Sequence, residues 1–224
     1  MPVPVLSFFS AADECSLLRQ KKCLSPFFLS PFFRLLCMNK LSRLKLRHAA
    51  TVIQSGGVVA YPTEAVFGLG CDPDCQTAVK QILDLKQRSQ QAGLILIAAD
   101  AAQLYDWITP TAAERERLFA ATHAVITWIV TANPLAPRWI TGGRKTIAVR
   151  ITRHPVAAAL CHLADTPLVS TSANRHGHAP ARSTLSVRCK FGRHIDYILP
   201  GTTGRQRQPS EIRDARTGTV LRPG

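Results

Sequence analysis

Short apolar runs alternate with helical patterns along the chain from residue 58 onward. The runs have the length and the β-branched or aromatic content of buried strands. They predict strands at 58–61, 94–99, 125–130, 146–151 and 195–199, and at the start of 167–174. Apolar positions that recur every three or four residues predict helices at 77–88, 101–121, 156–163 and 183–191. Strands that alternate with helices in this way are typical of an α/β domain whose sheet carries helices on both faces.

A polar turn follows the first predicted strand. Pro62 ends that strand because it has no N–H for the ladder. Thr63 and Glu64 follow at the carboxyl end, where open α/β sheets usually bind their ligands. Gly68 and Gly70 predict a tight backbone turn that comes close to a bound group. With the helix and the next apolar run, this turn predicts a strand–helix–strand unit with a ligand site.

Cations and small polar side chains accompany this turn. Lys86 and Arg88 lie at the end of the next helix, where surface cations contribute little, so we expect them to add little stability. Alternation leaves Arg150 on the face opposite Val149. The segment 167–174 ends in a row of hydroxyl and amide groups that suit ribose, phosphate or amino-acid groups. Capping of the following helix is the alternative role for this row.

The charges within the predicted helix at 101–121 indicate a solvated face. Glu114 and Glu116 lie beside Arg115 and Arg117 in the sequence. Alternating charges of this kind usually face water.

Composition favours a reduced protein with polyanionic partners. The chain has 224 residues and 46% hydrophobic content, enough for one large or two small domains. Its 28 Lys and Arg against 14 Asp and Glu give a formal charge of +14, which favours nucleic acid or nucleotides as partners. Seven cysteines without framework spacing indicate reduced thiols in a cytosolic protein. The pairs Cys71/Cys75 and His176/His178 do not have the spacing of zinc sites, so no protein metal site is expected.

Residues 1–37 differ in composition from the rest. They hold six of the nine phenylalanines, and prolines interrupt every apolar run. No run approaches the roughly 20 residues that a membrane-spanning helix needs, and the segment is a poor signal peptide. We expect residues 1–37 to be a poorly structured extension, which a misassigned start would explain, and residues 38–224 to form the domain.

Several well-known catalytic and nucleotide-binding motifs are missing from the sequence. It contains no GxxxxGK[ST] phosphate loop, no complete dinucleotide fingerprint, no GxSxG elbow and no HExxH helix. The residues themselves therefore predict an α/β protein with cations and hydroxyls around one cavity, and they leave the substrate open.

Five motifs follow one another between about residue 45 and the C-terminus. They read YPTEAVFGLGCDP, LKQR with LILIA after it, TIAVRITRHP, PLVSTSAN and PSEIRDA. In this order they resemble the YrdC/TsaC family, the threonylcarbamoyl-AMP synthases. The resemblance implies a single domain with a twisted, open, mixed parallel and antiparallel sheet, flanked by helices around a basic concave cavity. It also implies a nucleotidyltransferase that makes threonylcarbamoyl-AMP and pyrophosphate from L-threonine, bicarbonate and ATP for the t6A37 modification of tRNA.

The resemblance also implies roles for individual residues. The family's Lys-x-Arg pair matches Lys86 and Arg88, which would act in catalysis and bind ATP. Further ATP positions match Thr146, Ser172, Asn174 and Arg222. Threonine positions match Thr63, Arg150, Ser170 and Ser210. Arginine can hold a carboxylate through two parallel hydrogen bonds, and paired cations can offset the charge that develops as pyrophosphate leaves. No side-chain nucleophile is required, and Mg²⁺ is expected on the ATP phosphates.

Partners and alternatives follow from the same resemblance. The product would pass to t6A-transfer proteins of the TsaB, TsaD and TsaE type, and tRNA or double-stranded RNA is a further expected partner. We expect a cytoplasmic monomer without membrane association. One alternative is an RNA-binding module without synthase activity, which would use Arg175, Arg182, Arg188 and Arg193. Another is carbamoyl transfer, as in hydrogenase maturation proteins, whose acylphosphatase and zinc-finger regions this chain lacks.

Overall fold

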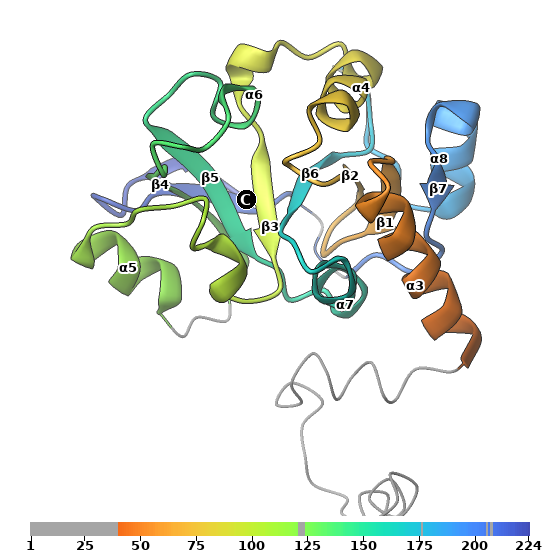
Figure 1. Ribbon diagram of the computed structural model, residues 1–224, viewed down its shortest axis with the longest axis horizontal. Helices are drawn as coiled ribbons and strands as arrows, with labels where there is room; N and C mark the ends of the chain where they lie inside the picture. The colour runs from red at the N-terminus through yellow and green to blue at the C-terminus, as the bar shows by residue number, and fades with distance from the viewer. Residues whose placement is uncertain (1–39, 121–123, 176, 205, 207) are drawn as a thin grey trace, which may run out of the picture.

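The structure, a computed structural model, describes residues 40–120, 124–175, 177–204, 206 and 208–224 (Figure 1). Within these ranges the chain forms a nine-stranded sheet in the order β7-β1-β2-β6-β3-β5-β4-β8-β9. The strands are β1 Val59–Pro62, β2 Phe67–Gly70, β3 Ile95–Ala98, β4 Ile126–Thr131, β5 Thr146–Ile151, β6 Leu168–Ser172, β7 Tyr197–Ile198, β8 Glu211–Asp214 and β9 Val220–Arg222. The pairs β1/β7, β3/β5 and β4/β8 are parallel, and the other five pairs are antiparallel. The mixed sheet implied by the resemblance is therefore confirmed.

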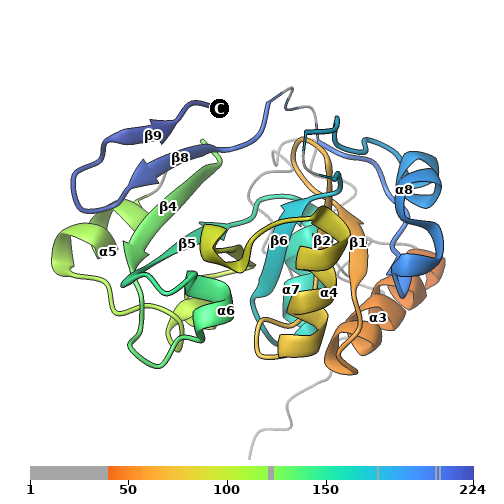
Figure 2. The ribbon, with the colours of Figure 1, turned by 90° about the horizontal axis from the view of Figure 1, so that it is seen from above.

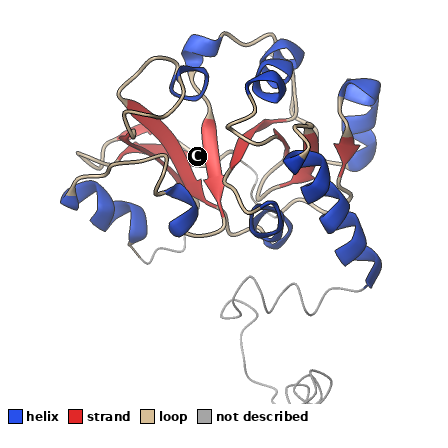
Figure 3. Cartoon of the chain, in the orientation of Figure 1, coloured by secondary structure: helices blue, strands red, loops and turns tan. Residues whose placement is uncertain are grey.

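Helices cover both sides of the sheet, as Figure 3 shows. The α-helices within the described ranges are α3 Lys40–Gln54, α4 Gln76–Lys86, α5 Ala112–Phe119, α6 Arg138–Thr141, α7 Pro155–Ala164 and α8 Thr184–Phe191. The helices predicted at 77–88, 156–163 and 183–191 correspond to α4, α7 and α8. The α/β class is confirmed.

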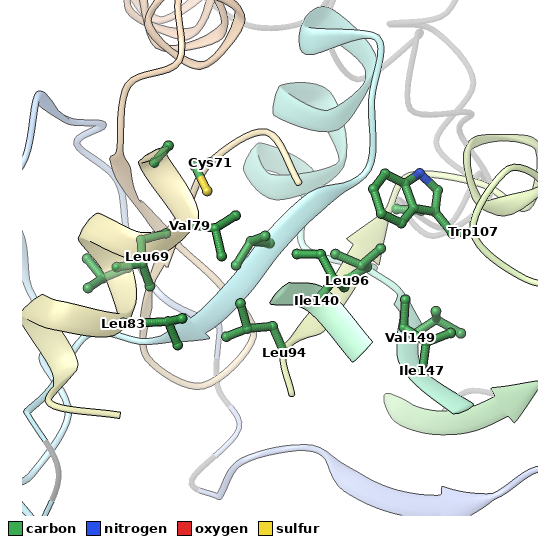
Figure 4. Close-up of a cluster of buried hydrophobic side chains, with 14 of the residues drawn as sticks. Leu69, Cys71, Val79, Leu83, Leu94, Leu96, Trp107, Ile140, Ile147 and Val149 are labelled. Atoms are coloured by element: carbon green, nitrogen blue, oxygen red, sulfur yellow. The ribbon is translucent and has the colours of Figure 1, made fainter. Parts of the chain in front are cut away.

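The strands place their side chains in two separate cores. In the first core, drawn in Figure 4, Leu96 and Val149 pack with Val79 of α4. In the second core, Tyr61 and Ile97 pack with α3 and α7 on the other face of the sheet. Directly paired residues of neighbouring strands point to the same face.

This pairing places two predicted site residues on the face of the second core. Ile97 is paired with Arg150 on β5 and with Leu168 on β6, and Ser170 lies two residues beyond Leu168. Arg150 and Ser170 therefore share the face on which α3 and α7 pack, and they line the cavity described below.

The prediction that Gly68 and Gly70 form a tight turn is wrong. Both residues belong to β2, which forms an antiparallel hairpin with β1. A Cβ atom at Gly70 would lie 2.3 Å from the carbonyl oxygen of Val169 and 2.7 Å from a ring carbon of Tyr61. The glycine therefore makes room for a neighbouring backbone and an aromatic ring, as glycine often does inside strands. The predicted strand–helix–strand unit is also changed, because β2 and β6 lie between β1 and β3.

The helix predicted at 101–121 is broken in the structure. It divides into a 3₁₀ helix, η2 (Ala102–Leu104), and α5 (Ala112–Phe119). Pro110 explains the break, because the residue before a proline disfavours helical backbone.

Glu114 is buried, contrary to the solvated face predicted for it. Its carboxylate accepts hydrogen bonds from Thr111 N at 2.8 Å, Thr131 N at 3.0 Å and Thr131 Oγ1 at 2.9 Å. Thr111 Oγ1 accepts from Glu114 N in return, which completes a capping box. Burial opposes ionisation, but these hydrogen bonds outweigh it and lower the pKa of Glu114. One ionised carboxylate therefore joins the start of α5 to the end of β4.

Replacement of Glu114 by alanine should lower the free energy of unfolding by about 2–4 kcal/mol, because several buried donors lose their acceptor. The pKa of Glu114 is lower in the folded protein, so its stabilisation is present above the unfolded pKa of about 4.3 and is lost as the pH falls below it. Urea unfolding at several pH values measures both effects. Glu116, which is exposed on the same helix, is the matched control. Equal losses in the Glu114→Ala and Glu116→Ala proteins would contradict this prediction.

The basic segment before β1 is helical from Lys40 to Gln54. Leu46 and Ile53 of α3 are buried in the second core. Residues 1–37 lie outside the described ranges, so their role stays a prediction.

We expect a protein that begins at Met38 to keep the melting temperature and activity of the full chain. A protein that begins at Ser55 is the contrasting control, because it also removes α3 and exposes the second core. Thermal unfolding of the three proteins tests this. A loss of more than about 2 kcal/mol at Met38 would mean that the first 37 residues pack on the domain.

Candidate active site

A cavity of about 330 Å³ is lined by segments that are far apart in the sequence. They are the turn after β1, Arg88 after α4, parts of β2, β3, β5, β6 and β9, and the residues just before β8. Figure 2 shows β1, β2 and β6 toward one end of the sheet and β8 and β9 at the other. The lining residues are Thr63, Glu64, Ala65, Val66, Phe67, Gly68, Arg88, Ile95, Arg150, Ser170, Thr171, Ser172, Asn174, Pro180, Gln206, Pro209, Ser210 and Arg222. Three of them are arginines and one is a carboxylate.

The turn after β1 is held by hydrogen bonds of its own. Thr63 N and Thr63 Oγ1 both donate to the carbonyl oxygen of Val66, at 3.0 and 2.7 Å. Gly204 N donates to Thr63 O at 2.9 Å. The hydroxyl of Thr63 has used its only proton, so toward a ligand it can act only as an acceptor.

Glu64 ties this turn to the segment after β5. Its Oε1 accepts from Thr152 Oγ1 at 2.7 Å, Arg153 N at 3.0 Å and His154 N at 3.3 Å. Its Oε2 is buried without a hydrogen-bond partner and lies 3.9 Å from Arg150 Nη2. Burial opposes ionisation, but the charge of Arg150 and the hydrogen bonds outweigh it and lower the pKa of Glu64. Glu64 is therefore an ionised, rigidly held carboxylate beside Arg150.

Arg150 is largely buried, with 11% of its side chain exposed. Its Nη1 donates to Ser210 Oγ at 2.9 Å, and Ser210 Oγ forms a second hydrogen bond with Thr127 Oγ1 at 2.8 Å. Its Nε is buried without a partner. A guanidinium has five N–H donors, and the contact of 3.9 Å with Glu64 is too long for a hydrogen bond. Several donors of Arg150 therefore remain for a ligand.

Lys86 is buried, and its ammonium is fully hydrogen-bonded. Its Nζ donates to Ser172 O at 2.5 Å, to Asn174 O at 2.8 Å and to Asn174 Oδ1 at 3.3 Å. Three acceptors match the three N–H donors of an ammonium. Burial, assisted by the charge of Arg88, lowers the pKa of Lys86 to about 8, so the group is mostly protonated at neutral pH. The structure therefore gives Lys86 a role that the sequence did not indicate, because it holds the end of β6, and we expect it to add stability.

The polar row at the end of β6 does not cap the next helix. Ser172 Oγ donates to Asn174 Oδ1 at 2.5 Å, and both residues line the cavity. The N-cap of α8 is Ser183, whose hydroxyl accepts from Ser186 N. The row is therefore available to a ligand, and the capping alternative is wrong.

Arg88 and Arg222 bring positive charge to the same cavity. Arg88 Nη2 donates to Gly93 O at 3.0 Å, and Arg222 Nη2 donates to Ser210 O at 2.9 Å. Partial burial, and then repulsion from Arg222, lowers the pKa of Arg88. Partial burial, and then repulsion from Arg150, lowers the pKa of Arg222. An anion placed among these arginines would relieve their repulsion.

Most of the predicted site residues meet in this cavity. Those that line it are Thr63, Arg88, Arg150, Ser170, Ser172, Asn174, Ser210 and Arg222. Lys86 and Thr146 are outside the lining. Lys86 acts on two lining residues, whereas Thr146 pairs with Thr131 of β4.

Three residues that lie outside the cavity lining and contact lining residues were not predicted from the sequence. Thr127 contacts Ser210, and Thr152 and His154 contact Glu64. The Thr-Arg-His-Pro run directly after β5 was a usable signal for the last two. Nothing in the sequence pointed to Thr127.

Other surface features bear on the alternatives. The arginines named for RNA binding, Arg175, Arg182, Arg188 and Arg193, are all exposed. Within the described ranges, no cluster of His, Cys, Asp and Glu side chains could hold a metal ion. In the same part of the chain, no helix is long and apolar enough to span a membrane.

The mixed sheet and its arginine- and hydroxyl-lined cavity define an α/β protein suited to a polar, anionic ligand. The sequence pattern of the Sua5/YciO/YrdC family, described as telomere recombination, matches residues 51–224, and the chain belongs to this family. The chain is 53% identical over 179 residues to the threonylcarbamoyl-AMP synthase of Nitrosococcus oceani, covering 80% of this chain and 97% of that protein. It is 47% identical over 189 residues to the threonylcarbamoyl-AMP synthase of Escherichia coli K12, covering 83% and 99%.

Solved structures agree with the fold. P. abyssi Sua5 in complex with L-threonine superposes with a TM-score of 0.75 at 34% identity, covering 81% of this chain. The match covers 54% of Sua5, so the chain spans about half of that protein. E. coli YciO gives a TM-score of 0.71 at 26% identity, covering 83% of this chain and 91% of YciO.

Proposed function

We propose that the protein is a threonylcarbamoyl-AMP synthase, a nucleotidyltransferase that joins L-threonine, bicarbonate and ATP. The observation that carries the proposal is one cavity that combines Arg150 and Ser210 with Arg88, Arg222 and the end of β6. Such a cavity offers a carboxylate site next to a phosphate site. Nearly full-length relatives named as this synthase, and a Sua5 structure that contains L-threonine, support the proposal.

In this proposal Arg150 and Ser210 bind the carboxylate of threonine. Arg150 has free N–H donors, and Ser210 already contacts its guanidinium. Thr63 can only accept, so it suits the amine or hydroxyl of threonine and not its carboxylate. Ser170, which is buried and lines the cavity, completes the threonine side.

ATP would occupy the side of the cavity that holds Arg88, Arg222, Ser172 and Asn174. The arginines can bind phosphate oxygens, and the hydroxyl and amide groups can bind ribose or phosphate. Lys86 would support this side mainly by fixing Ser172 and Asn174, and its longest contact, to Asn174 Oδ1, is the one a phosphate could replace. Thr146 remains a proposed outer position, since it does not line the cavity.

The proposed reaction has two steps. The amine of threonine attacks bicarbonate and forms an N–C bond, with loss of water, to give a carbamate. A carbamate oxygen then attacks the α-phosphorus of ATP, and the bond to the bridging oxygen breaks to release pyrophosphate. The side chains position the reactants and offset the charge on the leaving group, so no protein nucleophile is needed.

Magnesium enters this proposal as part of the MgATP substrate. Magnesium sites in nucleotide enzymes usually combine phosphates with one or two carboxylates. Glu64, the carboxylate of the lining, already accepts three hydrogen bonds through Oε1. The ion would therefore be held mainly by the phosphates.

The product would serve t6A37 formation in tRNA through t6A-transfer proteins of the TsaB, TsaD and TsaE type. We propose that the protein is a cytoplasmic monomer.

The second candidate function is that of an RNA-binding module without synthase activity. The observation that supports it is a set of exposed arginines, Arg175, Arg182, Arg188 and Arg193.

Pyrophosphate release tests the proposal directly. We expect release that requires ATP, L-threonine and bicarbonate together, with little when any one is omitted. Calorimetry with ATP and with L-threonine separates the two candidates, since an RNA-binding module has no reason to bind either. No binding of threonine and no threonine-dependent release would reject the synthase.

A further inference from the structure

Two polar groups fix the guanidinium of Arg150 from different elements. On one side, Glu64 Oε2 lies 3.9 Å from Arg150 Nη2, attractive in charge but too distant to use a hydrogen-bond donor. On the other side, Ser210 Oγ accepts from Nη1 at 2.9 Å. Ser210 in turn contacts Thr127 Oγ1 at 2.8 Å, and Thr127 is fully buried in β4. The arrangement holds Arg150, which lines the cavity, and uses one of the five N–H donors of its guanidinium.

The directions of these hydrogen bonds decide whether the hydroxyl of Ser210 can donate to a ligand. An arginine only donates, so Ser210 Oγ is the acceptor in the contact with Arg150. The contact with Thr127 can run in either direction. If Ser210 donated to Thr127, its hydroxyl would have no proton left for a ligand. If Thr127 donates, both lone pairs of Ser210 Oγ are occupied and its proton is free to point at an anion.

We propose that Thr127 is a positioning residue that donates its hydroxyl proton to Ser210. Ser210 then presents its O–H to the same carboxylate that Arg150 binds. The inference rests on the proposed function, because it identifies that carboxylate as the one of threonine. Thr127 lies behind Ser210 and outside the cavity lining, so it acts through Ser210 and not on the substrate.

Exchange of threonine for valine removes the hydroxyl and keeps the shape of the side chain. In the Thr127→Val protein we expect the KM for L-threonine to rise about fivefold or more, while the KM for ATP stays within about twofold. Thr127→Ser keeps the hydroxyl and should stay near the wild type. Should the valine protein fail to fold, Thr127→Ala against Thr127→Ser makes the same comparison, since both lack the methyl group.

A double-mutant cycle with Ser210→Ala distinguishes positioning from a general structural effect. If Thr127 acts through Ser210, adding Thr127→Val to Ser210→Ala should change the KM for threonine by less than about twofold. Independent, multiplying effects would overturn the inference. So would a lower melting temperature with an unchanged KM for threonine, or equal increases for threonine and ATP.

The wild-type assay keeps the two proposals apart. Threonine-dependent pyrophosphate release by the wild type tests the function before any variant is compared. If the wild type binds threonine without turnover, calorimetry of the same variants still decides the role of Thr127. If the wild type binds no threonine, both proposals fail.

Discussion

Replacement of Lys86 by alanine should reduce both stability and turnover, whereas Arg88→Ala should reduce turnover alone. Lys86 supplies three hydrogen bonds to Ser172 and Asn174 from a buried position, and alanine would remove one donor from each of these three oxygens. We expect a loss of about 2 kcal/mol of unfolding free energy, which is roughly 4–8 °C in melting temperature for a domain of this size. Adenylate formation should fall at least about tenfold in both variants.

Calorimetry, thermal unfolding and pyrophosphate release separate the two roles. Arg88 is exposed and its side chain makes one hydrogen bond, to Gly93 O, so its alanine variant should melt within about 2 °C of the wild type. Lys86→Met is the control for packing, since it keeps an apolar stem and removes only the donors. If Lys86→Ala melts like the wild type, the ammonium does not stabilise the end of β6. If Arg88→Ala turns over like the wild type, its proposed place at the phosphates is wrong.

Strand periodicity located the side chains of β5 correctly because it depends on local geometry alone. Alternation in Thr146–Ile151 separates Ile147 and Val149, which are buried in the first core, from Arg150. The same local information cannot show which strands become neighbours. The turn predicted at Gly68 and Gly70 was wrong for this reason.

Burial of polar groups was the other property that sequence could not supply. Glu114 and Lys86 looked like surface charges, because their partners Thr131, Ser172 and Asn174 are far from them in the sequence. The capping box formed by Thr111 and Glu114 was readable, and it would have placed the start of α5 correctly.

The residues that gather in the cavity were predicted through the motifs and not through their chemistry. The residues alone indicated an anionic ligand, and the resemblance named the particular side chains. Thr127 was missed because a threonine inside an apolar strand carries no signal of its own. Its contact with Ser210 joins positions 83 residues apart, which become neighbours only when β4 pairs with β8.

Replacement of Arg150 by lysine should weaken the binding of threonine and leave the binding of ATP nearly unchanged. Lysine keeps the charge but loses the planar fork, and with it the geometry that lets one group contact Ser210 and a carboxylate together. The apparent KM for threonine should rise by the equivalent of about 1–3 kcal/mol, or roughly 5- to 150-fold, while the KM for ATP barely changes. The alternative is that Arg150 serves mainly as the ion partner of Glu64.

The distance favours the ligand role, because the contact between Arg150 and Glu64 is 3.9 Å while Glu64 Oε1 is fully engaged by residues 152–154. ATP consumption titrated with threonine at saturating bicarbonate measures the effect, and Arg222→Lys is the matched control on the nucleotide side. In the Arg222→Lys protein the KM for ATP should rise and the KM for threonine should stay unchanged.

Equal weakening of the binding of both substrates in the Arg150→Lys protein, or a collapse of its melting temperature, would make Arg150 a structural ion partner. A lysine retains the charge that lowers the pKa of Glu64, so stability near pH 7 should survive the exchange and leave the threonine KM as the quantity that changes.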